Sequence, residues 1–473
     1  MILLRLVAAK LSILATCQFA IFLFANVGHA QGVSSGGQRA FVTGFTPIIG
    51  SRGVVGGIDV DTDGVLISAS ELSHKHLPKQ AIAERKRNGV HKGSIHEPSS
   101  MRFVSLAKLE AAIQKSIDAD SSLTDDILFL AGLQRIRYVF ACPSVDDIVI
   151  AGPVEDWELR DGQVVGIHNH KATLHLDDLL DALQSSAAAF HGKGISCSID
   201  PTEEGSKRLY RLLHRRNPQL DLAGRTLMEQ TMGAQVITLT GIRQSSHFAR
   251  VLVGSDYLMK RIAMGLDPSP LENLSSYLSL MKHHRSESHF LAPRFWLAPK
   301  YDTVEKSADE LVWHFNGTGL KTMTEHGYLN QNAQLVNAGR PNVDGQKWAD
   351  DFTAAYEELA VKQPVFGQLS GCVDLAVVAA IICQSDLMLR ARCPLLLLSD
   401  PMKIHGQEYS VPTSVSSLAS VTRGRKGWVV SVSGGVDLDI QTVLETASTN
   451  QDLDKIAPIS NGESWWWDSS PSN

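Results

Sequence analysis

From Met101 onward, segments with helical spacing and segments with strand-like composition are interleaved without strict alternation. The predicted helices include 105–117, 176–190, 245–265, 344–362 and 365–384. The predicted strands include 136–141, 147–152, 194–200, 235–240 and 294–299. Strict alternation would predict a parallel sheet with crossover helices. The observed order predicts an α+β fold, or a mixed α/β fold, with helices packed on a mixed sheet.

Composition divides the chain into five segments. Residues 1–30 are predicted to be a signal peptide, and residues 31–100 a flexible segment with a β-hairpin and a basic connector. Residues 101–290 are predicted to form an α/β domain. Residues 291–458 are predicted to form an α+β domain, because the pattern shifts toward strands past a polar hinge. Residues 459–473 form a polar tail with three adjacent tryptophans. The predicted architecture therefore has two halves.

The leader has the layout of a secretory signal. Arg5 and Lys10 precede an apolar run from Leu11 to Val27, and small residues follow up to Ala30. The run lies near the lower limit for spanning a bilayer, and no charged stop follows, so cleavage after Ala30 is favoured over a retained anchor. A lipoprotein signal at Cys17 is disfavoured because the apolar run continues past it. The sequence thus predicts export to the periplasm or the extracellular space.

The charge balance argues against nucleic acid as a partner. The chain carries a net charge of -6, and loss of the two leader cations leaves 42 basic and 50 acidic residues, a net charge of -8. Proteins that bind nucleic acid need a basic surface to displace counterions. No second apolar run reaches membrane length. The nearest, 376–383, is interpreted as part of a buried helix.

Five cysteines follow the leader: Cys142, Cys197, Cys372, Cys383 and Cys393. An exported chain can form disulfides, but an odd number of widely spaced cysteines favours buried free thiols. Two of them, at 372 and 383, are predicted to share one helix, where eleven residues span about 16 Å and exceed the reach of a disulfide. Pairing of Cys142 with Cys197, or of Cys393 with a helix cysteine, stays open.

Asp59, Asp61 and Asp63 alternate before Gly64, as in the first half of a calcium-binding loop. The position that would close such a loop with a carboxylate is Ser70, and no helix is predicted before it. A β-hairpin about the turn Asp61–Gly64 is therefore favoured over a calcium site. No other metal or cofactor is predicted.

The predicted helix from Ser245 to Met264 has an apolar stripe, and Arg250, Tyr257 and Arg261 gather on its other side. These three residues are the candidate ligand-binding face, for an anionic ligand or a partner's carboxylates. A solvated helix face is the simpler alternative. Within the same helix, Asp256 and Lys260 are spaced as an ordinary stabilising ion pair, worth a few tenths of a kcal/mol.

Familiar catalytic motifs are mostly absent from the sequence. Residues 32–36 have the Gly-x-Ser-x-Gly spacing around Ser34, but they follow the predicted cleavage site closely and lie outside any predicted strand–turn–helix, so the match is interpreted as accidental. It contains no zinc-protease motif, no P-loop and no dinucleotide-binding glycine motif. His168, His170 and His175 lie close together in the sequence. No nearby carboxylate or cysteine obviously completes a set of metal ligands, so a polar loop is favoured over a metal site. Asp374 lies inside an apolar helix and is interpreted as a satisfied core group rather than a catalyst.

Several stretches resemble one family, the exported planctomycete proteins catalogued only as a domain of unknown function. The similar stretches are LAGLQRIRYVFACPSVDDIVIAGPVEDW, LDDLLDALQ, GISCSIDPTEEG, SHFARVLVGSDYLMKRIAMGLDPSP and PVFGQLSGCVDLAVVAAII, within residues 101–385. The resemblance implies export and a single evolutionary unit, and it supplies no activity. We therefore expect an exported, non-enzymatic binding or envelope-associated module. A hydrolase with a site assembled only in three dimensions is the alternative.

Overall fold

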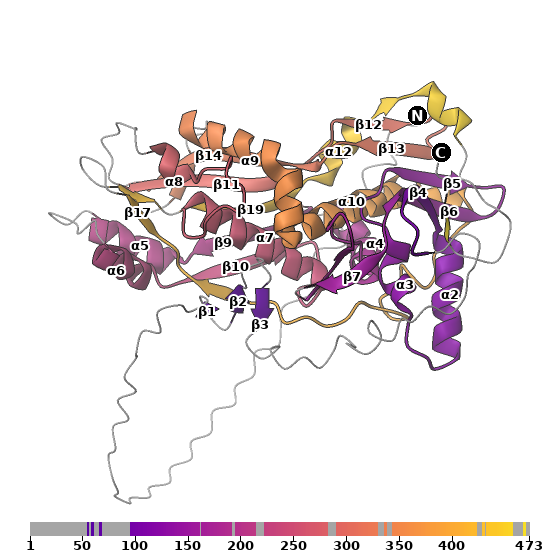
Figure 1. Ribbon diagram of the computed structural model, residues 1–473, viewed down its shortest axis with the longest axis horizontal. Helices are drawn as coiled ribbons and strands as arrows, with labels where there is room; N and C mark the ends of the chain where they lie inside the picture. Colours follow the sequence, from indigo (N-terminus) through magenta and orange to yellow (C-terminus); the bar gives the residue numbers. More distant parts are fainter. Residues whose placement is uncertain are drawn as a thin grey trace, which may run out of the picture. The chain divides into compact units, whose positions relative to one another are not determined.

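The computed structural model describes most of the chain beyond residue 94. The described residues are 95–160, 162–191, 194–213, 222–281, 290–329, 335–337, 343–422, 428–430, 432–456 and 467–469, with short strands at 54–55, 58–60 and 66–68. Within these ranges, eleven α-helices combine with sheets of mixed strand direction (Figure 1). The α+β class predicted from the sequence is confirmed.

The larger sheet has nine strands, seven of them in a continuous order. These are β15 (Leu335–Asn337), β14 (Gly319–Leu329), β11 (Phe290–Lys300), β19 (Ser433–Leu438), β9 (Ile195–Pro201), β10 (Ala234–Thr240) and β16 (Ser414–Ser416). Two further strands, β17 (Ser420–Thr422) and β18 (Trp428–Val430), join at β11. β18 and β19 run parallel to β11, whereas β14 runs antiparallel to it. Strands from both sides of residue 290 thus share this sheet.

The second sheet has seven strands. Their order is β20 (Ser448–Thr449), β12 (Thr303–Lys306), β13 (Val312–Asn316), β5 (Tyr138–Cys142), β6 (Asp147–Val154), β4 (Ser99–Ser105) and β21 (Trp467–Ser469). All neighbours are antiparallel except β12 and β20. A separate ribbon pairs β7 (Trp157–Arg160) with β8 (Gln163–Gly166). The described chain therefore crosses between the two large sheets four times, and two of these crossings, from β11 to β12 and from β13 to β14, are short connections without a helix.

The longer helices pack among these sheets (Figure 1). They are α2 (Leu106–Asp118), α4 (Leu176–His191), α5 (Glu203–Leu213), α6 (Leu222–Met232), α7 (His247–Ala263), α9 (Val343–Lys362) and α10 (Pro364–Gln384). The short helices are α3 (Asp125–Leu128), α8 (Tyr277–Leu280), α11 (Leu387–Arg390) and α12 (Ile440–Glu445). α10 packs against α4, α7 and α9, α7 packs on β9 and β19, and α9 packs on β14.

α10 is apolar on every side because it lies inside the protein. It begins with Pro364, a residue suited to the first turn of a helix. Among the described helices it alone is long and apolar enough to cross a membrane, and 94% of its most apolar window is buried. The expectation that 376–383 belongs to a buried helix is confirmed. Cys372 and Cys383 share this helix, and all five described cysteines are free thiols.

β4 was not predicted, because its sequence, SSMRFVS, places a cation in mid-strand. The guanidinium of Arg102 is nevertheless fully buried. It donates hydrogen bonds to the carbonyl oxygens of Ile95, Glu97 and Ala131, and it lies 4.6 Å over the ring of Trp467. Burial lowers the pKa of Arg102 to about 10. One tryptophan of the polar tail is therefore part of a sheet; its two neighbours lie outside the described residues.

α7 differs from the two-faced helix predicted from its sequence. Every residue of it is buried except Arg250 and Arg261. Lys260 is 3% exposed and Asp256 is fully buried, and Nζ of Lys260 lies 2.8 Å from Oδ2 of Asp256. The same Nζ donates to the carbonyl oxygens of Ile199 and Gly434, on β9 and β19. The interpretation of this pair as an ordinary stabilising pair worth a few tenths of a kcal/mol is wrong, because two strands cover the second face of the helix and bury both charges.

The aspartate-rich stretch forms strands. β1 (Val54–Val55) pairs with β2 (Ile58–Val60), and β2 pairs antiparallel with β3 (Leu66–Ser68). Asp59 lies within β2, opposite Ile67. This pairing is the predicted hairpin. Asp61 and Asp63 lie outside the described residues, so calcium binding there stays a prediction.

The buried ion pair in α7 gives a test of the packing. Removing one partner of a buried pair leaves the other charge without compensation, which costs about 3–5 kcal/mol. We expect Lys260→Met to lower the free energy of unfolding by about that amount in urea denaturation, and Asp256→Asn/Lys260→Met to lose less. The control is Lys347→Met, since Lys347 pairs with Asp351 at the surface and should change by less than about 0.5 kcal/mol. Equal losses for the two lysine variants would contradict the packing described for α7.

Candidate functional site

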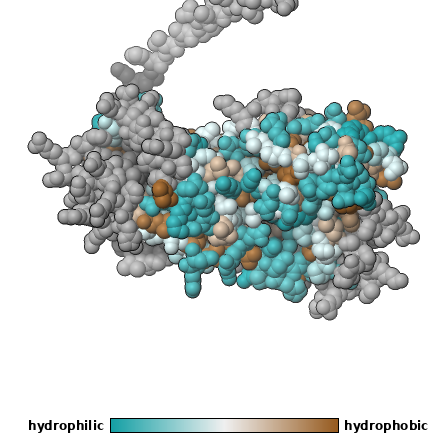
Figure 2. Space-filling model, turned by 90° about the horizontal axis from the view of Figure 1, so that it is seen from above, coloured by the Kyte–Doolittle hydropathy of each residue, from teal (hydrophilic) through white to brown (hydrophobic). Residues whose placement is uncertain are grey.

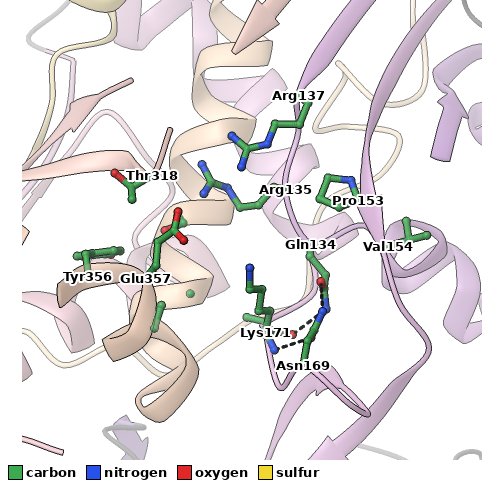
Figure 3. Close-up of a pocket in the computed structure, with 14 residues that line it drawn as sticks. Gln134, Arg135, Arg137, Pro153, Val154, Asn169, Lys171, Thr318, Tyr356 and Glu357 are labelled. Atoms are coloured by element: carbon green, nitrogen blue, oxygen red, sulfur yellow. Dashed lines mark hydrogen bonds between the residues drawn. The ribbon is translucent and has the colours of Figure 1, made fainter. Parts of the chain in front are cut away.

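A cavity of about 180 Å³ lies where the chain crosses between the two large sheets. The short crossings from β11 to β12 and from β13 to β14 are side by side, because the backbone N–H of Asp302 donates to the carbonyl oxygen of Asn316 at 2.8 Å. Thr318, on the second crossing, lines the cavity. The remaining walls come from residues 134–137, the end of β6 at Pro153 and Val154, the turn at 169–172, α9 and α10 (Figure 3). The cavity is thus built by segments far apart in the sequence.

Asp374, on α10, anchors one wall of the cavity from within the core. Its side chain is 1% exposed, and its carboxylate accepts four hydrogen bonds. Arg135 donates from Nε at 2.7 Å and from Nη2 at 3.0 Å, the backbone N–H of Ile136 donates at 2.9 Å, and the hydroxyl of Tyr301 donates at 2.7 Å. The prediction that Asp374 is a satisfied core group is confirmed.

Two pKa shifts accompany this network. Burial, together with the charge of Asp374, raises the pKa of Tyr301 well above its usual value, so the hydroxyl stays protonated and remains a donor. Burial alone would lower the pKa of Arg135, but the charge and hydrogen bonds of Asp374 outweigh it and leave that pKa raised. Arg135 therefore stays cationic, and most of its charge is balanced inside the protein.

Gly319 leaves the space that the Arg135 guanidinium occupies. It opens β14 with φ +78°, in the region that favours glycine. A Cβ atom at this position would lie 2.8 Å from Nη2 of Arg135. The turn between β13 and β14 and the position of Arg135 are therefore coupled.

Arg137 and Lys171 supply the cationic character of the cavity. Nη1 of Arg137 donates to the carbonyl oxygen of Gly317 at 2.9 Å, and the rest of its guanidinium faces the cavity (Figure 3). Burial, and then the neighbouring charge of Arg135, lower the pKa of Arg137. Nζ of Lys171 makes no hydrogen bond or ion pair with any other described residue. A bound anion would satisfy both side chains.

The turn that carries Lys171 is held rigidly. The side-chain amides of Gln134 and Asn169 pair reciprocally, at 3.0 and 2.8 Å. The carboxylate of Glu155, which is 4% exposed, accepts hydrogen bonds from the backbone N–H groups of His168 and Asn169 at 2.9 and 3.0 Å. Lys171 is therefore presented from a fixed backbone, which lowers the entropy lost when a ligand binds.

The hydroxyl groups at the cavity already have partners. Tyr356 donates to the carbonyl oxygen of Phe366 at 2.9 Å, and Ser370 donates to the same oxygen at 3.3 Å. Burial raises the pKa of Tyr356 far above its usual value, which makes it a poor proton donor. The described lining contains no histidine or cysteine beside these hydroxyls. The arrangement fits binding of an anion better than acid–base or nucleophilic catalysis.

The candidate binding residues on α7 lie outside this cavity. Arg261 forms two hydrogen bonds to the carboxylate of Asp267, at 2.6 and 2.7 Å, and its guanidinium lies 5.6 Å over the buried ring of Tyr257. Arg250 lies at the other end of the helix, 6.0 Å over the ring of Tyr409. The structure thus brings Tyr257 and Arg261 together but not Arg250. A ligand at these residues stays a prediction.

The three clustered histidines separate in the structure. His168 is exposed, and Nδ1 of His170 lies 3.0 Å from Nη1 of Arg160 in a turn. His175 instead stacks on His247, with ring centroids 4.5 Å apart. Within the described part of the chain, no group of three histidine, cysteine or acidic residues is arranged to hold a metal ion. The predicted polar loop is therefore observed for His168 and His170, but not for His175, which stacks on His247.

The pKa values of the two stacked histidines, His175 and His247, shift in opposite directions. Burial lowers the pKa of His247, but the adjacent carboxylate of Asp178, 2.9 Å from Nδ1, outweighs burial and leaves that pKa raised above 6.5. Burial, and then the charge of His247, lower the pKa of His175 to about 3. Nε2 of His175 is buried without a hydrogen-bond partner among the described atoms. His175 is therefore neutral in the folded protein at neutral pH, and His247 is the one of the two that takes up a proton first as the pH falls.

Sequence reasoning missed the residues that face the cavity, and one signal could have found two of them. Arg135 and Arg137 are separated by one residue at the start of a predicted strand, a spacing that points both side chains to one face. Nothing local in the sequence links them to Lys171 or to Glu357, which also faces the cavity from α9.

The shift at His175 predicts how stability depends on pH. The unfolded pKa is near 6.5 and the folded pKa near 3, so the stabilisation is present above pH 6.5 and is lost as the pH falls toward 3. The pKa of His247 is raised, so its contribution to the free energy of unfolding changes with pH in the opposite direction. That contribution is nearly constant below pH 6.5. Between pH 6 and pH 4.5, His175 alone should therefore lower the free energy of unfolding by about 2 kcal/mol.

We expect His175→Phe to lose about 2 kcal/mol less than the unchanged protein over this pH interval, measured by urea denaturation at both pH values. His168→Gln, at an exposed position, serves as the control and should keep the original pH dependence. If the His175 variant kept it as well, the neutral, buried state assigned to His175 would be wrong.

Comparison with known proteins adds a family description without an activity. A protein-family profile described as "Protein of unknown function (DUF1598)" matches residues 197–277. No curated protein and no solved structure matches the chain. The matched residues run from β9 to the start of α8 and contain Arg250, Tyr257 and Arg261, whereas the cavity described above is lined by residues outside them. A domain of unknown function is thus found at residues 197–277.

Proposed function

We propose that this chain is an exported, non-enzymatic binding module whose cavity takes a small anionic ligand. The convergence of Arg135, Arg137 and Lys171 on one cavity carries the proposal. Because Asp374 balances Arg135, the charge left to attract a ligand comes from Arg137 and Lys171. Export rests on the leader at residues 1–30. If it is cleaved as proposed, chain isolated from its host begins at Gln31.

The size of the cavity limits the ligand. Sites for drug-sized molecules enclose about 300–1,000 Å³. A cavity of about 180 Å³ is smaller. Small carboxylic acids and inorganic phosphate suit a cavity of this size.

A small ligand is favoured over a protein partner by the visible surface. The face shown in Figure 2 is mostly hydrophilic, and the hydrophobic residues described on it are scattered among polar ones. The most exposed large apolar side chains include Val343, at the start of α9, and Leu389 and Met402, in the segment that follows α10. Surface apolar residues spread in this way are ordinary, whereas a docking surface gathers them into one patch.

The alternative, a hydrolase, lacks support in the described lining. A hydrolase of the nucleophilic type needs a serine or cysteine next to a base. The serine that lines the cavity, Ser370, donates its hydroxyl hydrogen to the main chain, and the carboxylate that lines it is that of Glu357. These two groups do not form a hydrogen-bonded pair. We therefore keep binding as the proposed function.

Isothermal titration calorimetry of the purified chain with succinate, glutarate and inorganic phosphate tests the proposal. At least one of these anions should bind, and added salt should weaken the affinity. A hydrogen bond to a charged group contributes about 1.5–3 kcal/mol, so Arg137→Ala and Lys171→Ala should each lower the affinity about tenfold or more. The control is Lys207→Ala, on the surface of α5. Absence of heat with all three anions at millimolar concentration, or unchanged affinity in both cavity variants, would contradict the proposal.

A further inference from the structure

Glu357 is a negative group inside a cavity that is otherwise cationic. It belongs to α9, and its side chain turns toward the same space as Arg135, Arg137 and Lys171 (Figure 3). No described cation lies within ion-pair distance of its carboxylate, and it makes no hydrogen bond to another described side chain. Both arginines nevertheless lie within its electrostatic range, because the charge of Glu357 acts to raise their pKa values against the larger effect of burial.

The uncharged polar groups of the cavity are already paired within the protein. The amides of Gln134 and Asn169 bind each other, and the hydroxyls of Thr318, Tyr356 and Ser370 donate to carbonyl oxygens of the main chain. The groups left to select a ligand are therefore the charged ones. They are the free part of the Arg137 guanidinium, the ammonium group of Lys171 and the carboxylate of Glu357.

A dicarboxylate and a neutral ligand each leave at least one of these three charges without an opposite charge. A dicarboxylate would pair with Arg137 and Lys171, but it would bring its own negative charge against Glu357. A neutral ligand would pair with none of the three charges and would gain no charge-assisted hydrogen bond from them. A ligand with two carboxylates and one ammonium group satisfies each charge in the cavity with its opposite.

We infer that the cavity selects an acidic α-amino acid, which binds its carboxylates to Arg137 and Lys171 and its ammonium group to Glu357. This inference rests on the proposed function and adds a selectivity that the function alone does not require. Glu357 acts as the specificity-determining residue, since it favours the ligand that carries an amino group and disfavours the otherwise identical acid that lacks one.

Two matched pairs of ligands test the inference by isothermal titration calorimetry. L-Glutamate and glutarate differ by the amino group alone, as do L-aspartate and succinate. The unchanged protein should bind the amino acid of at least one pair more than tenfold tighter than its partner. In Glu357→Gln this preference should fall to about twofold or less, and glutarate should bind tighter than it does to the unchanged protein, because the opposing charge is gone.

Glu358→Gln provides the matched control. Glu358 is the next residue on α9 and is exposed, but it does not line the cavity, so its variant should keep the full preference. If glutarate and glutamate bound equally to the unchanged protein, while Arg137→Ala and Lys171→Ala weakened both, the anion site would stand and the selectivity inferred for Glu357 would be wrong. If none of the four acids bound but inorganic phosphate did, the inference would be wrong and the proposed function would remain; if phosphate also failed to bind, both would be wrong. A preference that survived in Glu357→Gln would place the amino-group contact elsewhere and overturn the role of Glu357.

Discussion

The buried carboxylate of Asp374 is the interaction on which the described site depends. An apolar helix such as α10 can pack in many rotations, because burial of apolar surface is favourable but not directional. The carboxylate of Asp374 restricts the rotation of the helix, because a buried carboxylate must accept hydrogen bonds from donors in the core. The donors come from residues 135–136, just before β5, and from Tyr301, at the crossing from β11 to β12. One side chain thereby fixes α10 against the segment that precedes β5 and against the crossing from β11 to β12.

The same interaction sets the charge of the cavity. Arg135 is balanced by Asp374 and forms part of the wall, while Arg137, two residues later, keeps most of its donors free. Had Asp374 been apolar, Arg135 would carry an unbalanced charge beside Arg137, and the crowding of two guanidinium groups would oppose the observed geometry. The core network therefore allows the cavity to hold several cations without requiring a permanent counter-ion, which leaves room for an exchangeable ligand.

Much of the fold could be predicted from the sequence, because many helices and strands have a recognisable local pattern of residues. The helices at 176–191 and 364–384 and the strands at 147–154 and 234–240 follow from spacing and composition, and so does the hairpin of β2 and β3. The satisfied state of Asp374 was also predictable, since an isolated carboxylate in an apolar helix must have partners. Which partners it has could not be predicted.

The remainder depends on contacts between distant segments. The strand β19 that covers the second face of α7 lies about 170 residues further along the chain, so helical spacing alone suggested a solvated face with a surface ion pair. The cavity likewise gathers residues near 135, 171, 318 and 357. The sequence around each of these residues contains no motif that indicates a site. They come together only because the chain crosses between two sheets.

The free energy of unfolding of Asp374→Asn, compared with that of Asp351→Asn at the surface of α9, tests the central claim most directly. The amide keeps the shape of the side chain but removes the charge that balances Arg135, and breaking a buried pair in this way costs about 3–5 kcal/mol. The account predicts a loss of that size for Asp374→Asn and a loss below about 0.5 kcal/mol for Asp351→Asn. Equal, small losses for the two variants would contradict the role assigned to Asp374.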